Sequence, residues 1–176
     1  MLKMDIWYIY KIKEMITIIT KSTSNTCCFI GHKRINETKE LRTRVRESIE
    51  RLITQEKADT FLFGSNSRFD SLCLELVTEI KEKHPHVKRI YVRAEYPVIS
   101  DTYREYILRS YDGTYYPDKI RGSGRAVYVE RNREMIDRSR ICIVYYDESN
   151  VPSNRKSGTK AALDYAKKKG REIILI

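Results

Sequence analysis

The chain has 176 residues, 41% of them hydrophobic, and its 34 Lys and Arg residues against 24 Asp and Glu residues give a formal net charge of +10. This length fits one domain, the apolar content argues against a disordered chain, and only 7 Gly and 4 Pro exclude collagen-like and low-complexity classes. The charge predicts an anionic partner, and a nucleic acid, a nucleotide and an acidic membrane surface all fit it at this point.

Residues 1–26 are expected to form an N-terminal extension and a polar linker. Charged residues interrupt the apolar positions of residues 1–20, so no run approaches the roughly 20 apolar residues that span a bilayer. We therefore expect no membrane span and no membrane partner, and we favour a docked or partly ordered extension over an interfacial helix. Residues 27–176 are expected to form one domain.

From residue 27 onward, short apolar runs alternate with longer stretches of helical periodicity. The expected strands are residues 27–30, 60–63, 88–94, 141–145 and 173–176. The expected helices are residues 37–55, 69–83, 127–138 and 161–169. Continuously apolar strands separated by helices are typical of a parallel sheet covered on both faces. The sequence thus predicts a doubly wound α/β fold with a mainly parallel sheet of about five strands.

Residues 95–126 form a tyrosine-rich insertion between the third and fourth expected strands. A stretch of this length inside a compact domain is often a lid or a binding loop. The alternative is a helix at residues 101–111 that packs its tyrosines on the core. Both interpretations remain open.

The four cysteines, Cys27, Cys28, Cys73 and Cys142, form no Cys-x-x-Cys pair. Most lie in apolar runs, where thiols usually act as small buried hydrophobic groups. We therefore expect reduced thiols, no metal site and a cytoplasmic protein.

Polar, glycine-containing segments follow the first and second expected strands, and another precedes the last expected helix. In open parallel sheets, ligands bind beyond the carboxyl ends of the strands, where glycine allows close approach and a helix N-terminus favours an anion. Residues 157–159 suit a phosphate, although Ser or Thr there also caps helices. The candidate binding residues in the three segments are Gly31, His32 and Arg34; Gly64, Ser65 and Asp70; and Ser157, Gly158 and Thr159.

Dinucleotide, Walker and nucleophile-elbow motifs are absent from the sequence. Arg131 and Asn132, on the helix before the fourth strand, suit a phosphate or carboxylate, and a solvated helix face is the alternative. If the protein is an enzyme, the candidate acids and bases are His32, Asp70 and Asp147.

Four segments together resemble the SLOG superfamily, and within it the YpsA-related branch. They are CFIGHKR at residues 28–34, FGS with FD at residues 63–65 and 69–70, YVERNREMIDRS at residues 128–139, and KSGT with YA at residues 156–159 and 165–166. The superfamily joins the DprA/Smf DNA-processing proteins and the lonely-guy phosphoribohydrolases. The resemblance extends over residues 27–176.

The resemblance implies a Rossmann-like fold and a nucleotide or nucleotide-derivative ligand, with ADP-ribose-like and NAD-derived molecules favoured. The candidate residues named above match its ligand loops, with phosphates at Ser157, Gly158 and Thr159. Relatives also suggest self-association, and no metal is indicated. The second loop departs from the Gly-Gly-Ala of many relatives, because Ser65 and Asn66 follow Gly64.

Lonely-guy enzymes carry Pro-Gly-Gly-x-Gly-Thr-x-x-Glu, in which the Glu serves hydrolysis, and here Ala162 stands at that position. An alanine supplies no acid or base, so the sequence favours a binding or sensing domain over an enzyme. Two alternatives remain open. One is a nucleotide N-glycosidase or phosphoribohydrolase-like hydrolase, and the other is a DprA-type protein that binds single-stranded nucleic acid. The second is less favoured because the basic residues are interspersed with acidic ones.

Overall fold

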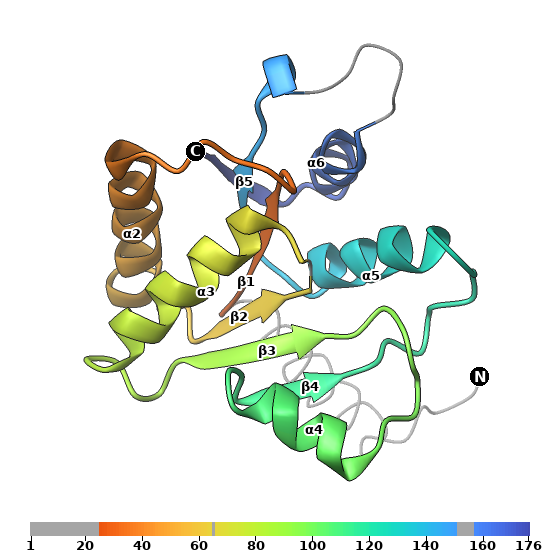
Figure 1. Ribbon diagram of the computed structural model, residues 1–176. Coiled ribbons are helices and arrows are strands. Elements are labelled where there is room, and N and C mark those ends of the chain that lie inside the picture. Colours follow the sequence, from red (N-terminus) through yellow and green to blue (C-terminus); the bar gives the residue numbers. More distant parts are fainter. Residues whose placement is uncertain (1–24, 65, 151–156) are drawn as a thin grey trace, which may run out of the picture.

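The structure, a computed structural model, describes residues 25–64, 66–150 and 157–176. Its centre is a six-stranded sheet in which every strand pair is parallel, with the order β4-β3-β2-β1-β5-β6 (Figure 1). The strands are β1 (Thr26–Gly31), β2 (Thr60–Phe63), β3 (Lys88–Val92), β4 (Gly113–Tyr115), β5 (Ile141–Tyr145) and β6 (Glu172–Leu175). The helices are α2 (Lys39–Thr54), α3 (Arg68–Lys81), α4 (Asp101–Leu108), α5 (Ala126–Asp137), α6 (Gly158–Lys168) and a short 3-10 helix, η1 (Glu148–Asn150).

The predicted α/β, Rossmann-like fold is confirmed, with one strand more than expected. The additional strand is β4, a three-residue edge strand within the tyrosine-rich insertion that pairs with β3. It begins at Gly113, a residue type that weakens strands, and its shortness leaves no alternating pattern to detect. A smaller correction concerns Thr26, which belongs to β1 and not to the linker.

Alternating side chains of the central strands form two separate cores. On one face, Phe29 and Phe61 pack against α2 and α3. On the other, Cys28 and Leu62 pack against α5 and α6, as expected where successive strand side chains point to opposite faces. Figure 1 shows these two layers of helices on either side of the sheet. The strand order reverses between β1 and β5, the place where ligands bind in doubly wound sheets.

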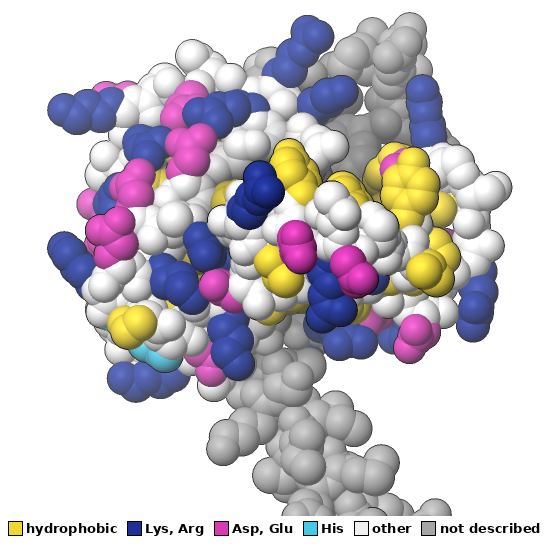
Figure 2. Space-filling model, turned by 60° about the horizontal axis from the view of Figure 1, so that its bottom comes forward, with side chains coloured by type: hydrophobic (Ala, Val, Ile, Leu, Met, Phe, Trp, Pro, Cys, Tyr) yellow, Lys and Arg dark blue, Asp and Glu magenta, His cyan; other side chains and the backbone are white. Residues whose placement is uncertain are grey.

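The tyrosines of α4 do not pack on the core. Ile107 is the buried residue of this helix, whereas Tyr103 and Tyr106 are 40% and 64% exposed. The helix ends at Leu108, and Tyr111 beyond it packs against Phe63. A helix predicted at residues 101–111 is thus confirmed in shortened form, and the predicted packing on the core holds for Tyr111 and is wrong for Tyr103 and Tyr106. Figure 2 shows hydrophobic side chains among charged ones on this side of the molecule.

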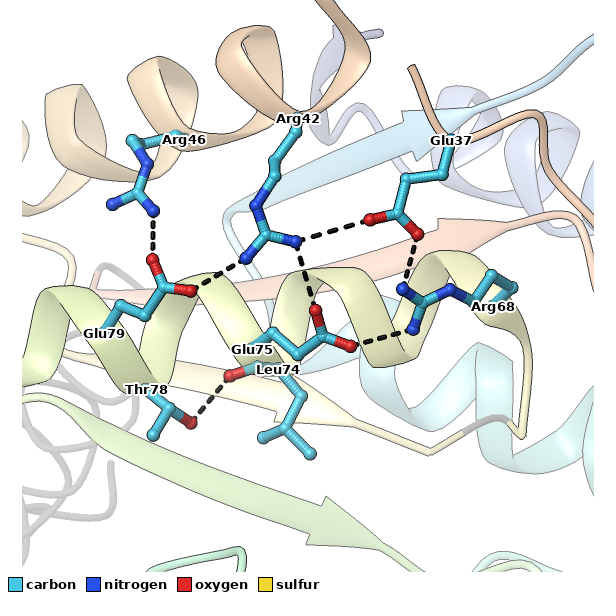
Figure 3. A network of polar contacts seen from close by, with 8 residues as sticks. All are labelled: Glu37, Arg42, Arg46, Arg68, Leu74, Glu75, Thr78 and Glu79. Atoms are coloured by element: carbon cyan, nitrogen blue, oxygen red, sulfur yellow. Dashed lines mark hydrogen bonds and ion pairs between the residues drawn. The ribbon is translucent and has the colours of Figure 1, made fainter. Parts of the chain in front are cut away.

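A network of ion pairs joins α2 to α3 (Figure 3). The guanidinium of Arg42 lies 3.1 Å from Glu75 and 2.7 Å from Glu79, and Arg68 lies 2.8 Å from Glu75. Hydrogen bonds from these arginines and from Arg46 hold the pKa values of Glu75 and Glu79 below their usual range. These arginines are therefore neutralised by acids of the neighbouring helix, which reduces the basic surface open to a polyanion.

A second ion-pair cluster makes stability depend on acid pH. Partial burial acts to raise the pKa of Asp112, but hydrogen bonds from Arg89 and Lys81 outweigh it and lower the pKa to about 2. A depressed carboxyl pKa stabilises the fold above the unfolded-state pKa, and this contribution is lost as the pH falls from about 4 to about 2. Because solvent screens the interactions of this exposed residue, we expect Asp112→Asn to lower the free energy of unfolding by about 1 kcal/mol at pH 7 and by almost nothing near pH 2. Denaturant titrations of the wild type and the variant across this pH range measure the difference. The control is Glu105→Gln, which makes the corresponding acid-to-amide change at an exposed residue. A difference that does not shrink with acid would contradict this assignment.

All four cysteines are buried and form no disulfide. The sulfur atoms of Cys28 and Cys142 lie 3.5 Å apart on the paired strands β1 and β5, and burial raises the pKa of the Cys27 and Cys73 thiols. Within the described part of the chain, no three His, Cys, Asp or Glu side chains form a group that could hold a metal ion. None of the helices found in that part has the length and apolar character needed to cross a membrane.

Candidate functional site

A cavity of about 710 Å³ opens at the carboxyl ends of β1, β2 and β3. It is bounded by the loops that follow these strands, by α4 and α5 and by the first turn of α6. The described residues that line it are Gly31, His32, Lys33, Gly64, Asn66, Ser67, Tyr91, Arg93, Ala94, Glu95, Tyr96, Tyr103, Tyr128, Arg131, Asn132, Ser157, Gly158 and Thr159.

Most of the binding residues expected from the sequence lie around this cavity. Arg34 is exposed on the loop after β1 and does not line it. Asp70 and Asp147 do not line it either, and Ser65 lies outside the described residues. The expected residues that the structure brings together are Gly31, His32, Gly64, Arg131, Asn132, Ser157, Gly158 and Thr159.

The sequence left the tyrosine-rich insertion at residues 95–126 open as a binding loop, but it did not single out Arg93, Glu95 or Tyr128 as site residues. Arg93, Glu95 and Tyr96 line the cavity, and Tyr103 and Tyr128 join them from α4 and α5. The signal was available, because β3 is also a parallel strand whose carboxyl end lies at the same edge of the sheet. The segment after β3 contains no glycine, and glycine was the feature that marked the other candidate ligand loops in the sequence.

At two positions of the site, side chains of neighbouring helices occupy the space that a Cβ atom would need, so glycine is required there. A Cβ atom on Gly31 would lie 2.2 Å from the ring of Phe69, and one on Gly64 would lie 2.6 Å from the guanidinium of Arg131. Both distances are shorter than any van der Waals contact. The need for glycine at these positions therefore follows from packing between the strand ends and the helices beside them.

Arg131 is a buried cation at the wall of the cavity. Arg131 is only 3% exposed. Its guanidinium donates one hydrogen bond from Nε to Oδ1 of Asn132 at 2.9 Å and another from a terminal nitrogen to the carbonyl of Val92 at 3.5 Å. Burial lowers the pKa of Arg131, although the charge of Asp70 acts in the opposite direction. None of the described carboxylates comes within ion-pair distance of it. Among the described residues, these two hydrogen bonds leave part of the donor capacity of the guanidinium unused.

The first turn of α6 presents backbone donors to the same cavity. The hydroxyl of Ser157 accepts a hydrogen bond from the N–H of Lys160 at 3.2 Å and so caps the helix. The Thr159 hydroxyl donates to the carbonyl of Gly31 at 3.2 Å and connects α6 to the end of β1. Both hydroxyls therefore have structural partners. The N–H groups of Gly158 and Thr159, the first two of the helix, have no intrahelical acceptor and lie at its positive end.

His32 connects the ends of β1 and β5. Its Nε2 accepts a hydrogen bond from the backbone N–H of Asp147 at 2.9 Å, and its ring packs against Tyr145 and Tyr146. An accepting Nε2 carries no proton, so this contact requires the neutral imidazole. The carboxylate of Asp147 accepts from the N–H and hydroxyl of Ser149. These two candidate catalytic groups thus hold the strand ends in place.

Asp70, the third catalytic candidate, is 3% exposed in the first turn of α3. Its backbone N–H donates to the hydroxyl of Ser67, which caps the helix, at 3.0 Å. Its charge acts on Arg131 through the protein interior. The structure therefore places Asp70 behind the cavity wall, where it offsets part of the charge of the buried arginine.

The far end of the cavity, beyond β3, combines cations, an acid and tyrosines. The Arg93 guanidinium donates to the carbonyls of Tyr96 at 2.7 Å and Pro97 at 3.3 Å, and burial lowers its pKa. The hydroxyl of Tyr128 donates to the carboxylate of Glu95. Glu95 alone is acidic among the described lining residues, whereas three of them, Lys33, Arg93 and Arg131, are cationic. The arrangement suits a ligand with one anionic end.

Comparison with known proteins gives a relative and no family model. No family model matches the chain. A protein of Bacillus subtilis (strain 168), the uncharacterized SPbeta prophage-derived protein YoqJ, is 31% identical over 144 residues. The match covers 73% of this chain and 81% of the relative.

Proposed function

We propose that this chain, which belongs to the family of the SPbeta prophage-derived protein YoqJ, is a cytoplasmic domain that binds or senses a nucleotide or nucleotide derivative. Its cavity lies at the switch point of a doubly wound sheet, a frequent nucleotide site. The resemblance of the sequence to the SLOG superfamily favours an ADP-ribose-like or NAD-like ligand.

The observation that carries the proposal is the environment of Arg131. Burying a cation with no described carboxylate at ion-pair distance costs free energy that the more distant Asp70 offsets only in part, and a bound anion recovers the rest. The planar guanidinium is suited to a phosphate because it offers parallel N–H donors. An arginine that is 3% exposed and still faces a cavity is therefore best explained by an anionic ligand.

The first turn of α6 is the proposed site of the phosphates. The N–H groups of Gly158 and Thr159, which have no acceptor within the helix, and the helix dipole favour an anion there, and both residues line the cavity with Arg131. The hydroxyls of Ser157 and Thr159 would orient this turn without contacting the phosphate, because both already have partners.

Hydrolysis has weaker support than binding. Ala162, at the position of the lonely-guy glutamate, is 6% exposed and lies on the buried face of α6, which packs on the core. His32 is engaged by a backbone N–H, and neither Asp70 nor Asp147 lines the cavity. We therefore propose ligand binding without assigning a reaction.

A thermal-shift panel of NAD, ADP-ribose, ADP, AMP and ATP tests this proposal. A ligand that binds only the folded state raises the midpoint of unfolding, and at one hundred times its Kd it adds about 2.7 kcal/mol of stability. We expect at least one member to stabilise the protein in a concentration-dependent manner. Failure of all five with protein shown to be folded would refute the proposal.

A further inference from the structure

The end of the cavity beyond β3 differs chemically from the phosphate end. Three tyrosines line it, and each is partly exposed as a whole residue: Tyr96 by 65%, Tyr103 by 40% and Tyr128 by 42%. Accessible aromatic faces of this kind stack on nucleobases regardless of base identity. The tyrosines thus mark this end as the place for the nucleoside part of a ligand.

Glu95 places a negative charge at this end of the cavity. Its carboxylate accepts the hydroxyl hydrogen of Tyr128. Tyr128 precedes Arg131 by three residues on α5, and its ring centre lies 5.9 Å from the Arg131 guanidinium carbon. Glu95 therefore contacts the hydroxyl end of Tyr128, and Arg131 lies near its ring. A carboxylate can only accept hydrogen bonds and repels phosphate, whereas the guanidinium attracts it.

We propose that Glu95 accepts hydrogen bonds from the vicinal ribose hydroxyls of the bound nucleotide, with Tyr128 positioning the carboxylate. The inference rests on the proposed function. Carboxylates near the strand ends of doubly wound sheets bind ribose hydroxyls because two adjacent O–H donors match the acceptor oxygens. The carboxylate of Glu95 beyond β3 and the N-terminus of α6 then fix one orientation of the ligand, with the ribose near β3 and the phosphates near α6.

Calorimetric titration of ADP, 2′-deoxy-ADP and pyrophosphate into the wild-type protein and Glu95→Ala tests this role. A hydrogen bond to a charged group predicts that the wild type binds ADP about 10-fold or more tightly than 2′-deoxy-ADP. Glu95→Ala should bind the two nucleotides equally, because the hydroxyl has lost its acceptor. It should bind pyrophosphate at least as tightly as the wild type does. Tyr128→Phe should show a smaller loss that is confined to ADP.

The matched control is Glu105→Ala, an exposed glutamate of α4 that does not line the cavity, which should leave all three affinities unchanged. Equal affinity of the wild type for ADP and 2′-deoxy-ADP would overturn the role of Glu95 and leave the proposed function standing. Equal weakening of all three ligands in Glu95→Ala would also overturn it. If neither nucleotide binds to the folded wild type, both the proposed function and this inference fail for adenine nucleotides.

Discussion

Arg131→Met is expected to abolish stabilisation by nucleotides and to leave the ligand-free protein at least as stable as the wild type. Removing one partner of a desolvated charge pair costs about 2–5 kcal/mol of binding, or a rise in Kd of at least about 30-fold. The same change removes a cation that is 3% exposed and has no carboxylate at ion-pair distance in the described structure. Burying a cation with no carboxylate at ion-pair distance costs free energy, and an apolar side chain of similar size removes that cost. Thermal unfolding with and without ligand measures both effects.

The opposite directions of these two effects make the test sharp. A variant that merely damaged the fold would lose stability and binding together. Arg133→Met on the same helix is the control, because Arg133 is exposed and does not line the cavity. Gly64→Ala displaces the Arg131 guanidinium by a Cβ at 2.6 Å and should weaken binding in the same way. Unchanged binding in Arg131→Met would exclude this arginine as the anion site.

The sequence predicts the central sheet well because its strands are continuous apolar runs. The expected bounds of the strands at residues 60–63 and 141–145 are those observed. The start of α6 was placed too late, because Gly158, Thr159 and Lys160 lack an apolar face. The capping role of Ser157, the alternative to a phosphate contact, is the one that the structure shows. Strand β4 forms because β3 offers an edge for pairing, which a local pattern does not reveal.

The site was predicted less completely than the fold. The rule that ligands bind beyond strand ends predicts Gly31 and Gly64, which line the cavity, and Arg131, predicted from the chemistry of its guanidinium, lines it too. The rule did not give the reason for the glycines, because Phe69 and Arg131 approach them only in three dimensions. It also did not identify Glu95, which no motif contains. Side chains from separate elements meet through tertiary packing, so their pairing is invisible in local sequence.

Gly31→Ala is expected to have the largest effect on stability of any single methyl addition at the site. The new Cβ would lie 2.2 to 2.6 Å from three atoms of Phe69, and that ring is fully buried and stacks on Tyr145. Phe69 cannot move without disturbing the core, and overpacking of this kind costs about 3 kcal/mol or more. For a chain of this size the midpoint of thermal unfolding should fall by about 6–12 °C.

Gly158→Ala is the matched control, because its Cβ meets nothing within 4 Å and it begins a helix, where alanine is the better residue. Its unfolding midpoint should match or slightly exceed that of the wild type. Phe69→Leu gives a further check, because the smaller side chain frees space beside residue 31. The double variant Gly31→Ala with Phe69→Leu should therefore be more stable than the sum of the two single changes predicts. Additive losses would show that the contact with Phe69 is not what requires glycine at the end of β1.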